Sequence, residues 1–211
     1  MSSVASTSAK LGPPLRGFEH VNRYWDRHFD IPAAKIMPGE FYVTNKDEVI
    51  VTVLGSCISA CVRDQLFGIG GMNHFMLPIQ GDEDAPQQFG NAERYGNVAM
   101  EHLINAILVN GGRRENLEVK LFGGGRILTQ MTDVGQRNIA FVHDYLHTEG
   151  LRIAAEDLGD VFPRKVYYFP RTGMVKVRKL RSLQNTTIAE RESEYLNGII
   201  RKPVAGEVDL F

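Results

Sequence analysis

Residues 54–78 read LGSCISACVRDQLFGIGGMNHFMLP, and this stretch determines the fold prediction. ISACVRD and GIGGMNHFML each have the apolar composition of a strand, and DQLFG between them has that of a hairpin turn. Cys57 directly follows a tight Gly-Ser pair, and His74 lies in the second apolar run. The stretch therefore predicts a β-hairpin, and it raises the question whether the hairpin carries a thiol nucleophile with its base.

The segments around this hairpin predict a mixture of strands and helices. EVIVTVL, LEVKLFGGG and LRIAAED have strand composition, and RKVYYFP and MVKVRKL form a second hairpin through Arg171, Thr172 and Gly173. Helical periodicity indicates helices at residues 92–109, in QRNIAFVHDYLHTEG and in TTIAERESEYL. Several hairpins combined with helices favour the α+β class over a purely parallel sheet.

The length of 211 residues suits one domain with appendages. We expect a disordered tail at residues 1–16, rich in Ser, Ala and Pro, a single domain at 17–182, and a C-terminal helix and tail at 183–211. The segment before EVIVTVL is expected to pack as an N-terminal lead-in, and residues 80–96 as a loop. Glu190 and Glu192 are expected early in the last helix, where negative charge suits the helix dipole.

Composition and charge restrict the class of protein. Lys+Arg number 24 and Asp+Glu 25, so the net charge of −1 gives no sign of wholesale binding to nucleic acid or to an anionic membrane. The two cysteines, Cys57 and Cys61, are too few for a secreted disulfide scaffold. The N-terminus lacks the apolar core of a signal peptide, and no run has the length of a membrane span. We therefore expect a reduced, cytoplasmic protein without membrane insertion.

The first hairpin can bring a thiol and an imidazole together. If its turn is centred between Gln65 and Leu66, Cys57 lies opposite His74, with Cβ atoms roughly 4.5–5.5 Å apart. An adjacent imidazole can take the thiol proton and so generate the nucleophilic thiolate. The backbone N–H groups of Ser56 and Cys57, beside the Gly-Ser pair, could stabilise an oxyanion. The pattern is compatible with a thiol nucleophile and its base.

Structural roles remain open for the same residues. A buried cysteine is often a small apolar side chain, and a strand histidine is often only hydrogen-bonded. Cys61 is expected to face Gly70 and to be structural. Cys57, Cys61 and His74 could be zinc ligands, but three residues between the two cysteines are a weak indication of a zinc site, and no fourth ligand is evident. HDYLH lacks the Glu of a metalloprotease motif. FGGGR lacks the rest of a nucleotide-binding motif, so this segment predicts a turn or close packing.

A basic run lies near the C-terminus. No acidic residue occurs between Asp160 and Glu190, whereas seven basic residues do: Arg164, Lys165, Arg171, Lys176, Arg178, Lys179 and Arg181. Strand alternation in MVKVRKL places Lys176 and Arg178 on the solvent face, with Val175 and Val177 inward. The run is either an ordinary solvated face or, with Lys176, Arg178 and Lys179, a docking surface for an acidic partner.

Several of these segments together resemble one known family. LGSCISACVRD, GIGGMNHFMLP, RYGNVAMEHLI, VKLFGGG, VGQRN, AAEDLGD and RKVYYFPRTGMVKV are similar to the chemoreceptor glutamine deamidase family, CheD, in the family's order over residues 40–182. The resemblance implies a cysteine hydrolase that converts glutamines of methyl-accepting chemotaxis receptors to glutamates. It also implies packed mixed β-sheets flanked by helices, as in the catalytic domain of cytotoxic necrotizing factor toxins.

The resemblance further implies a triad without metal or organic cofactor. Cys57 would be the nucleophile, His74 the base, and a threonine of the preceding strand the third member. Thr52 is the threonine of that strand. Its spacing from Cys57 is one residue shorter than in some members, so a bulge or turn would have to absorb the difference.

Other functions stay open at this point. One is a non-catalytic module that binds a response-regulator phosphatase of the CheC type. Others are a thiol protease, a transglutaminase, or an esterase for receptor methyl esters.

Overall fold

The computed structural model describes residues 11–78, 89–127, 134–181 and 185–201. The loop prediction for residues 79–88, the C-terminal tail from residue 202 and the first ten residues of the predicted N-terminal tail lie outside these ranges. Within them, the chain near residues 11–13 contacts the folded body. Arg23 donates to the carbonyl oxygens of Leu11 and Gly12, and Lys46 donates to that of Pro13.

Ten strands form two five-stranded sheets. The first sheet has the order β1-β2-β4-β9-β10, with the bounds Asn22–Asp26, Ile31–Lys35, Val49–Leu54, Arg164–Phe169 and Met174–Lys179. The second sheet has the order β3-β6-β5-β7-β8, with the bounds Phe41–Thr44, Gly70–Asn73, Ile58–Asp64, Leu117–Gly123 and Ile153–Leu158. β2 pairs with β4 and β7 with β8 in parallel, and the other pairs are antiparallel, so both sheets are mixed.

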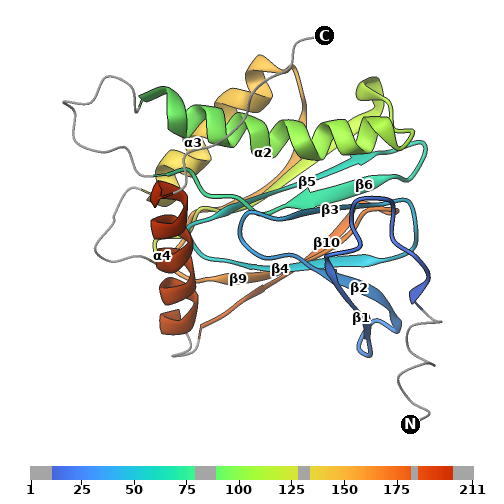
Figure 1. Cartoon of the computed structure of the whole chain (residues 1–211), viewed down its shortest axis with the longest axis horizontal. Coiled ribbons are helices and arrows are strands. Elements are labelled where there is room, and N and C mark those ends of the chain that lie inside the picture. Colours follow the sequence, from blue (N-terminus) through green and yellow to red (C-terminus); the bar gives the residue numbers. More distant parts are fainter. Residues whose placement is uncertain (1–10, 79–88, 128–133, 182–184, 202–211) are drawn as a thin grey trace.

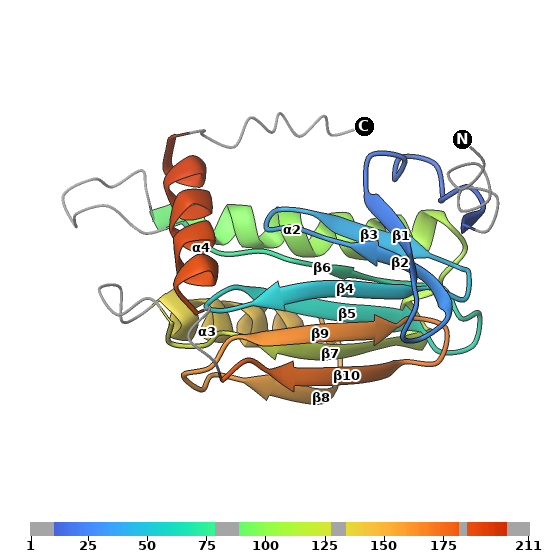
Figure 2. The ribbon, with the colours of Figure 1, turned by 90° about the horizontal axis from the view of Figure 1, so that it is seen from below.

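The two sheets stack face to face, and helices cover the second one (Figures 1 and 2). α2 (Phe89–Val109) and α3 (Val134–Thr148) lie on its outer face, while α4 (Asn185–Arg201) stands at one end of both sheets. A short 3₁₀ turn, η1 (Arg114–Asn116), precedes β7. This arrangement confirms the α+β class with mixed sheets and flanking helices.

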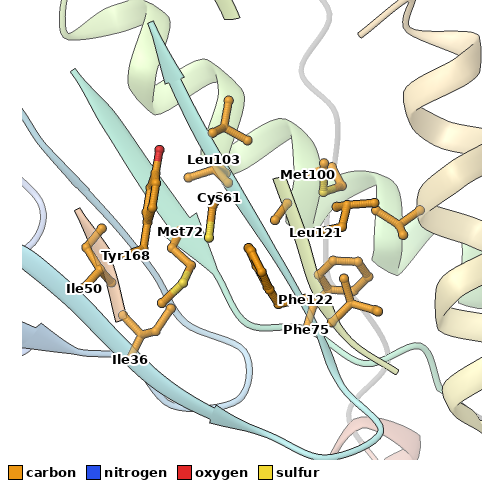
Figure 3. Close-up of a cluster of buried hydrophobic side chains, with 14 of the residues drawn as sticks. Ile36, Ile50, Cys61, Met72, Phe75, Met100, Leu103, Leu121, Phe122 and Tyr168 are labelled. Carbon is orange, nitrogen blue, oxygen red and sulfur yellow. The ribbon is translucent and has the colours of Figure 1, made fainter. Parts of the chain in front are cut away.

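The main core fills the space between the sheets and beneath the helices. Ile50 from one sheet, Ile36 directly after β2, Met72 from the other sheet and Leu103 from α2 are all buried in it (Figure 3). A smaller cluster of Ala33, Val49, Val51 and Phe169 lies apart from it, with Phe29 and Tyr167 packed against it. Among the described helices, none is both long and apolar enough to cross a lipid bilayer.

Most elements predicted from periodicity are present, but the N-terminal region contains more structure than predicted. The lead-in segment holds three strands, β1, β2 and β3, and β1 and β2 are short and only partly buried. The loop prediction is wrong from residue 89 onward because α2 begins at Phe89. Glu192 is not in the first turn of the last helix, since α4 begins at Asn185.

The first hairpin has a different register from the predicted one. Its strands pair Cys61 with Met72 and Arg63 with Gly70, so the prediction that Cys61 faces Gly70 is wrong. The turn is centred further along because the Asp64 carboxylate accepts hydrogen bonds from Leu66 and Phe67, and its backbone N–H donates to Ile69. The bridge between Ile58 and Phe75 continues this register, so Cys57 lies diagonal to His74 rather than directly opposite.

Candidate active site

The turn at residues 55–57 joins β4 to β5 and is held by backbone contacts from a second loop. Gly124 N–H donates to the Cys57 carbonyl at 2.8 Å, and Gly125 N–H donates to the Gly55 carbonyl at 2.7 Å. A Cβ at Gly123 would lie 2.0 Å from the Cys57 carbonyl oxygen, so this approach requires glycine. The FGGGR segment therefore packs against the 55–57 turn, as the alternative of close packing predicted.

Asn138 of α3 fixes the turn from the helix side. Its side-chain N–H donates to the Ser56 carbonyl at 2.8 Å, and its side-chain oxygen accepts from Leu77 N–H at 2.9 Å. The side chain is completely buried, so both hydrogen bonds are shielded from water. Asn138 thus couples α3 to the turn that carries Cys57 and to the strand end beyond His74.

Thr52 and His74 form a buried hydrogen bond behind the turn. Thr52 Oγ1 lies 2.8 Å from His74 Nδ1, and both residues are almost fully buried. Thr52 Oγ1 also donates to the Ile36 carbonyl at 2.9 Å. A hydroxyl has one proton to donate, so toward the imidazole the Thr52 oxygen must accept.

These two contacts determine the histidine tautomer. Nδ1 carries the proton that is donated to Thr52, and Nε2 is left with its lone pair in the neutral ring. Nε2 is buried and has no hydrogen-bond partner within the described part of the chain. The imidazole is therefore oriented as a proton acceptor, with Thr52 on its far side.

Cys57 lies beside this imidazole and is fully buried. Its Sγ, a ring nitrogen of His74 and a carboxylate oxygen of Glu192 all lie within 4.8 Å of one another. Burial, followed by the charge of Glu192 and its hydrogen bond, raises the pKa of the Cys57 thiol well above its ordinary value. Burial, followed by the positive charge of Arg191, lowers the pKa of His74 to about 3. Both groups are neutral in this conformation at pH 7.

The carboxylate of Glu192 fills the concave side of the 55–57 turn. Its two oxygens accept hydrogen bonds from Gly55 N–H at 2.7 Å, Ser56 N–H at 2.8 Å, Ser56 Oγ at 2.6 Å and Cys57 N–H at 3.4 Å. Successive backbone N–H groups in a tight turn form a binding site for anions. A Cβ at Gly55 would lie 2.8 Å from this carboxylate and 2.0 Å from the Ile127 side chain, so a larger residue there would have to displace both side chains.

The thiol, imidazole and carboxylate are also the donor types that zinc prefers. Both Glu192 oxygens, however, already accept hydrogen bonds from the turn. Cys61, the third zinc ligand that was weighed on the sequence, points into the apolar core with Met72 and Leu121 nearby in the cluster (Figure 3). The geometry of the described residues fits proton transfer between Cys57 and His74 better than metal binding.

Comparison with known proteins identifies the family. A family profile described as CheD chemotactic sensory transduction matches residues 76–179. A Halorhodospira halophila protein is 56% identical over 200 residues, which cover 93% of each chain. A Methylobacillus flagellatus protein is 55% identical over 203 residues, covering 95% of this chain and all of the relative, and one from Saccharophagus degradans is 51% identical over 213 residues, covering 99% and 98%. The chain belongs to the CheD family.

All three relatives carry the name "Probable chemoreceptor glutamine deamidase CheD". The family profile begins at residue 76, so it leaves out Thr52, Cys57 and His74. The three relatives align over 93%, 95% and 99% of this chain, including Thr52, Cys57 and His74, and they support the resemblance that the sequence motifs indicated. The roles of the individual site residues rest on the geometry above.

The residues predicted for the CheD-type site come together in space. Thr52, Ser56, Cys57 and His74 lie around one point, although β4, the turn and the end of β6 supply them separately. Thr52 lies within β4, and Cys57 follows it in the 55–57 turn, which lies outside both strands. His143 is elsewhere: it faces Glu156 at 2.9 Å on the exposed side of α3.

The basic hairpin of β9 and β10 adjoins the strand of Thr52, because β9 pairs with β4 and places Val166 opposite Thr52, but it uses several of its charges internally. Arg164 is buried and contacts Asp157 and the Gly159 carbonyl, so it does not belong to a surface. Lys179 pairs with Asp160 at 2.8 Å, and Lys176 lies 4.8 Å from the centre of the Phe29 ring. Lys176 and Arg178 are exposed and Val175 and Val177 half-buried, which confirms the predicted alternation.

Sequence reasoning missed two polar residues of the site, Asn138 and Glu192. Each is a buried polar residue on the apolar face of a helix. Asn138 lies at helical spacing with Val134, Val142 and Tyr145, and Glu192 with Ile188, Leu196 and Ile199. A polar side chain within an apolar stripe needs a buried partner, and that signal could have singled out both residues.

Proposed function

We propose that this CheD-family chain deamidates glutamine side chains of chemoreceptors, with Cys57 as nucleophile, His74 as general base and Thr52 as the group that orients His74. The observation that carries the proposal is the pair of Thr52 hydrogen bonds, which leaves His74 Nε2 free to accept a proton beside the Cys57 thiol. The names of the relatives supply the substrate class.

The first half-reaction forms a thioester. His74 Nε2 takes the proton of Cys57, and the thiolate Sγ attacks the carboxamide carbon of the substrate glutamine. We assign the stabilisation of the developing oxyanion to the backbone N–H groups of Ser56 and Cys57, which in the structure each donate to a different oxygen of the Glu192 carboxylate. The C–N bond breaks, the proton returns from His74 to the nitrogen, and ammonia leaves.

The second half-reaction regenerates the thiol. Water loses a proton to His74 Nε2 and attacks the thioester carbonyl, the C–S bond breaks, and Sγ recovers the proton. The sum is glutamine plus water giving glutamate plus ammonia. Thr52 accepts the hydrogen bond of Nδ1–H throughout, and this contact favours the imidazolium that forms between the two proton transfers.

Three further parts of the proposal concern setting and partners. The stacked mixed sheets make the catalytic domain of cytotoxic necrotizing factor toxins the fold that we propose as most similar. We place the activity in the cytoplasm, where thiols stay reduced and receptor signalling regions are reached. A phosphatase of the CheC type is the proposed regulatory partner, and Lys176, Arg178 and Lys179 are the proposed docking residues for acidic protein surfaces.

Mass spectrometry of a chemoreceptor co-expressed with this protein tests the function. Specific receptor glutamines should become glutamates with the wild-type chain and remain glutamines with Cys57→Ala. Loss of receptor methyl esters without glutamine conversion would instead identify an esterase. Receptor cleavage or crosslinking would identify a protease or a transglutaminase, and full signalling by Cys57→Ala would favour a non-catalytic binding module.

A further inference from the structure

The active site is closed by the chain itself. Cys57, His74 and the 55–57 turn are all buried, and α4 supplies the group that covers them. A cavity of about 480 Å³ lies between α2 and α3 and is lined by residues such as Ala92, Glu101 and Phe141. A smaller cavity, of about 180 Å³, is lined by His74 and Tyr95 among others, and Cys57 lines neither of the two. In the described conformation Glu192 occupies the N–H groups of the 55–57 turn, so a substrate that uses these donors must displace it.

Glu192 has the chemistry of the reaction product. Deamidation of a glutamine leaves a glutamate whose carboxylate sits where the oxyanion formed. One Glu192 oxygen accepts from Gly55 and Cys57 N–H, the other accepts from Ser56, and a carboxylate oxygen lies within 4.8 Å of Cys57 Sγ. The side chain of residue 192 therefore occupies the position that a product glutamate would take before release.

α4 is docked through one face of the helix. Besides Glu192, the Tyr195 hydroxyl hydrogen-bonds that of Tyr95 on α2, its ring packs over Gly39, and Leu196 is completely buried in the main core. Among the described residues, the side-chain hydrogen bonds from α4 to the body of the protein come from Glu192 and Tyr195. A helix that docks through one face at the end of both sheets can detach at a lower free energy than global unfolding.

We propose that α4 is a built-in product analogue: Glu192 occupies the carboxylate site of the 55–57 turn, and a substrate helix must displace α4 to be deamidated. The analogy with product rests on the proposed function, whereas the closure of Cys57 by α4 does not. The inference also defines how substrate is presented, because α4 demonstrates that the site receives a side chain projecting from a helix.

The charges of α4 oppose the reaction, as does the steric coverage of Cys57 by the helix. Glu192 places a negative charge beside Cys57, which disfavours the thiolate, and Arg191 places a positive charge near His74, which disfavours the imidazolium. Displacement of α4 removes both perturbations together. The arriving substrate thus encounters a thiol and an imidazole that are more ready to exchange a proton.

Alkylation of Cys57 by iodoacetamide tests closure without reference to the reaction. The full-length wild type, Glu192→Ala and the matched control Glu194→Ala, at an exposed position of the same helix, are compared with EDTA present to remove any bound metal. We expect Glu192→Ala to speed Cys57 alkylation about tenfold or more, since charge-assisted hydrogen bonds are lost. Glu194→Ala should match the wild type, and Cys61 should stay unlabelled as a monitor of folding. Equal Cys57 rates in all three would overturn the closure.

Glu192→Gln tests the product analogy, because it converts the analogue into a substrate. The thiolate of Cys57 should attack the carboxamide of the introduced glutamine, release ammonia and, after hydrolysis, restore glutamate at position 192. The purified variant should therefore carry Glu192 again, while Cys57→Ala/Glu192→Gln should keep the glutamine. Fragment spectra must place the change at residue 192, because Asn197-Gly198 in the same tryptic peptide is prone to spontaneous deamidation.

The outcomes separate this inference from the proposed function. If Glu192→Gln keeps its glutamine while a co-expressed receptor is deamidated, α4 is not a product analogue. If neither glutamine is converted, the deamidase function itself is wrong, and the alkylation rates alone decide whether α4 covers Cys57. Conversion of the introduced glutamine that persists in the Cys57→Ala background would also overturn the analogy, because the reaction would not use the thiol.

Discussion

The 55–57 turn and the β9–β10 hairpin handle charge in opposite ways. At the turn, one buried carboxylate from a distant helix is bound by donors of three consecutive residues. Along the hairpin, cations such as Lys176 and Arg178 lie exposed on a strand at the edge of its sheet. Arg178 is paired across the strands with Lys165, so two like charges face each other and gain nothing from the contact.

The difference shows that the role of a polar side chain can be inferred from its contacts where the side chain is buried, and much less where it is exposed. At the 55–57 turn and the Thr52–His74 pair behind it, buried hydrogen bonds fix the orientation of each polar group. The tautomer of His74, for example, follows from the single proton that Thr52 can donate. At the exposed Lys176 and Arg178 of the hairpin, water screens the charges, and no buried ion-pair partner among the described residues fixes their geometry. Variants should therefore have large, specific effects at the turn and small, salt-dependent effects at the hairpin.

The largest effect is expected from Cys57→Ala. Removal of the nucleophile should lower receptor deamidation roughly 10³-fold or more while the protein stays folded. Cys61→Ser is the matched control: its new hydroxyl lacks a partner in the core and should lower Tm, but the rate per folded molecule should remain near wild type. An inactive Cys61→Ser with an active Cys57→Ala would reverse the assignment.

His74→Ala should have the next largest effect. Loss of the general base should lower the chemical rate by about 10²- to 10⁴-fold, because the thiol then loses its proton only to water. Receptor binding, measured with the Cys57→Ala background as reference, should be unchanged. A variant that turns over normally but binds receptor weakly would show His74 to be structural.

The sequence predicted these two residues correctly as neighbours, yet with the wrong register. The predicted turn centre was displaced because the capping role of Asp64 was not recognised, but the displacement keeps Cys57 and His74 on adjacent positions of the hairpin. Strand composition and glycine turns were sufficient for most of the two sheets. β1 and β2 were missed because their short, half-buried sequences carry little periodic signal.

The partners of Glu192 could not be found from local pattern, because they are backbone N–H groups more than a hundred residues earlier in the chain. The segment TTIAERESEYL alone does not predict which groups its apolar face contacts. The prediction of Glu192 early in the helix is wrong for a simpler reason, since α4 begins at Asn185, directly before this segment, and Glu192 lies beyond its first turn. Long-range contacts of this kind depend on tertiary docking rather than on helix propensity.

Thr52 allows a finer test of the turn. Thr52→Val removes the acceptor of His74 Nδ1–H with little change in shape, and loss of one buried hydrogen bond should lower kcat about tenfold. Thr52→Ser keeps the hydroxyl and should retain most of the activity. The comparison of kcat in these two variants reports orientation of the imidazole, and equal kcat values would exclude Thr52 from the triad.

The smallest effect is expected at the hairpin, from Lys176→Glu/Arg178→Glu. Reversal of two exposed charges should raise KM for receptor a few-fold, about 2- to 5-fold at low salt, and leave kcat near wild type, because rim charges mainly steer association. The control Arg113→Glu/Arg152→Glu makes the same net charge change at exposed positions outside the hairpin. Lys179 is a poorer probe, since Lys179→Glu also breaks its pair with Asp160.

The rise in KM of Lys176→Glu/Arg178→Glu should fade as salt is raised and the Debye length shortens from about 10 Å at 0.1 M. If KM is unchanged at low salt, or shifts equally in the control, the hairpin is an ordinary solvated face, and the contrast with the 55–57 turn becomes one between a functional site and a surface without one.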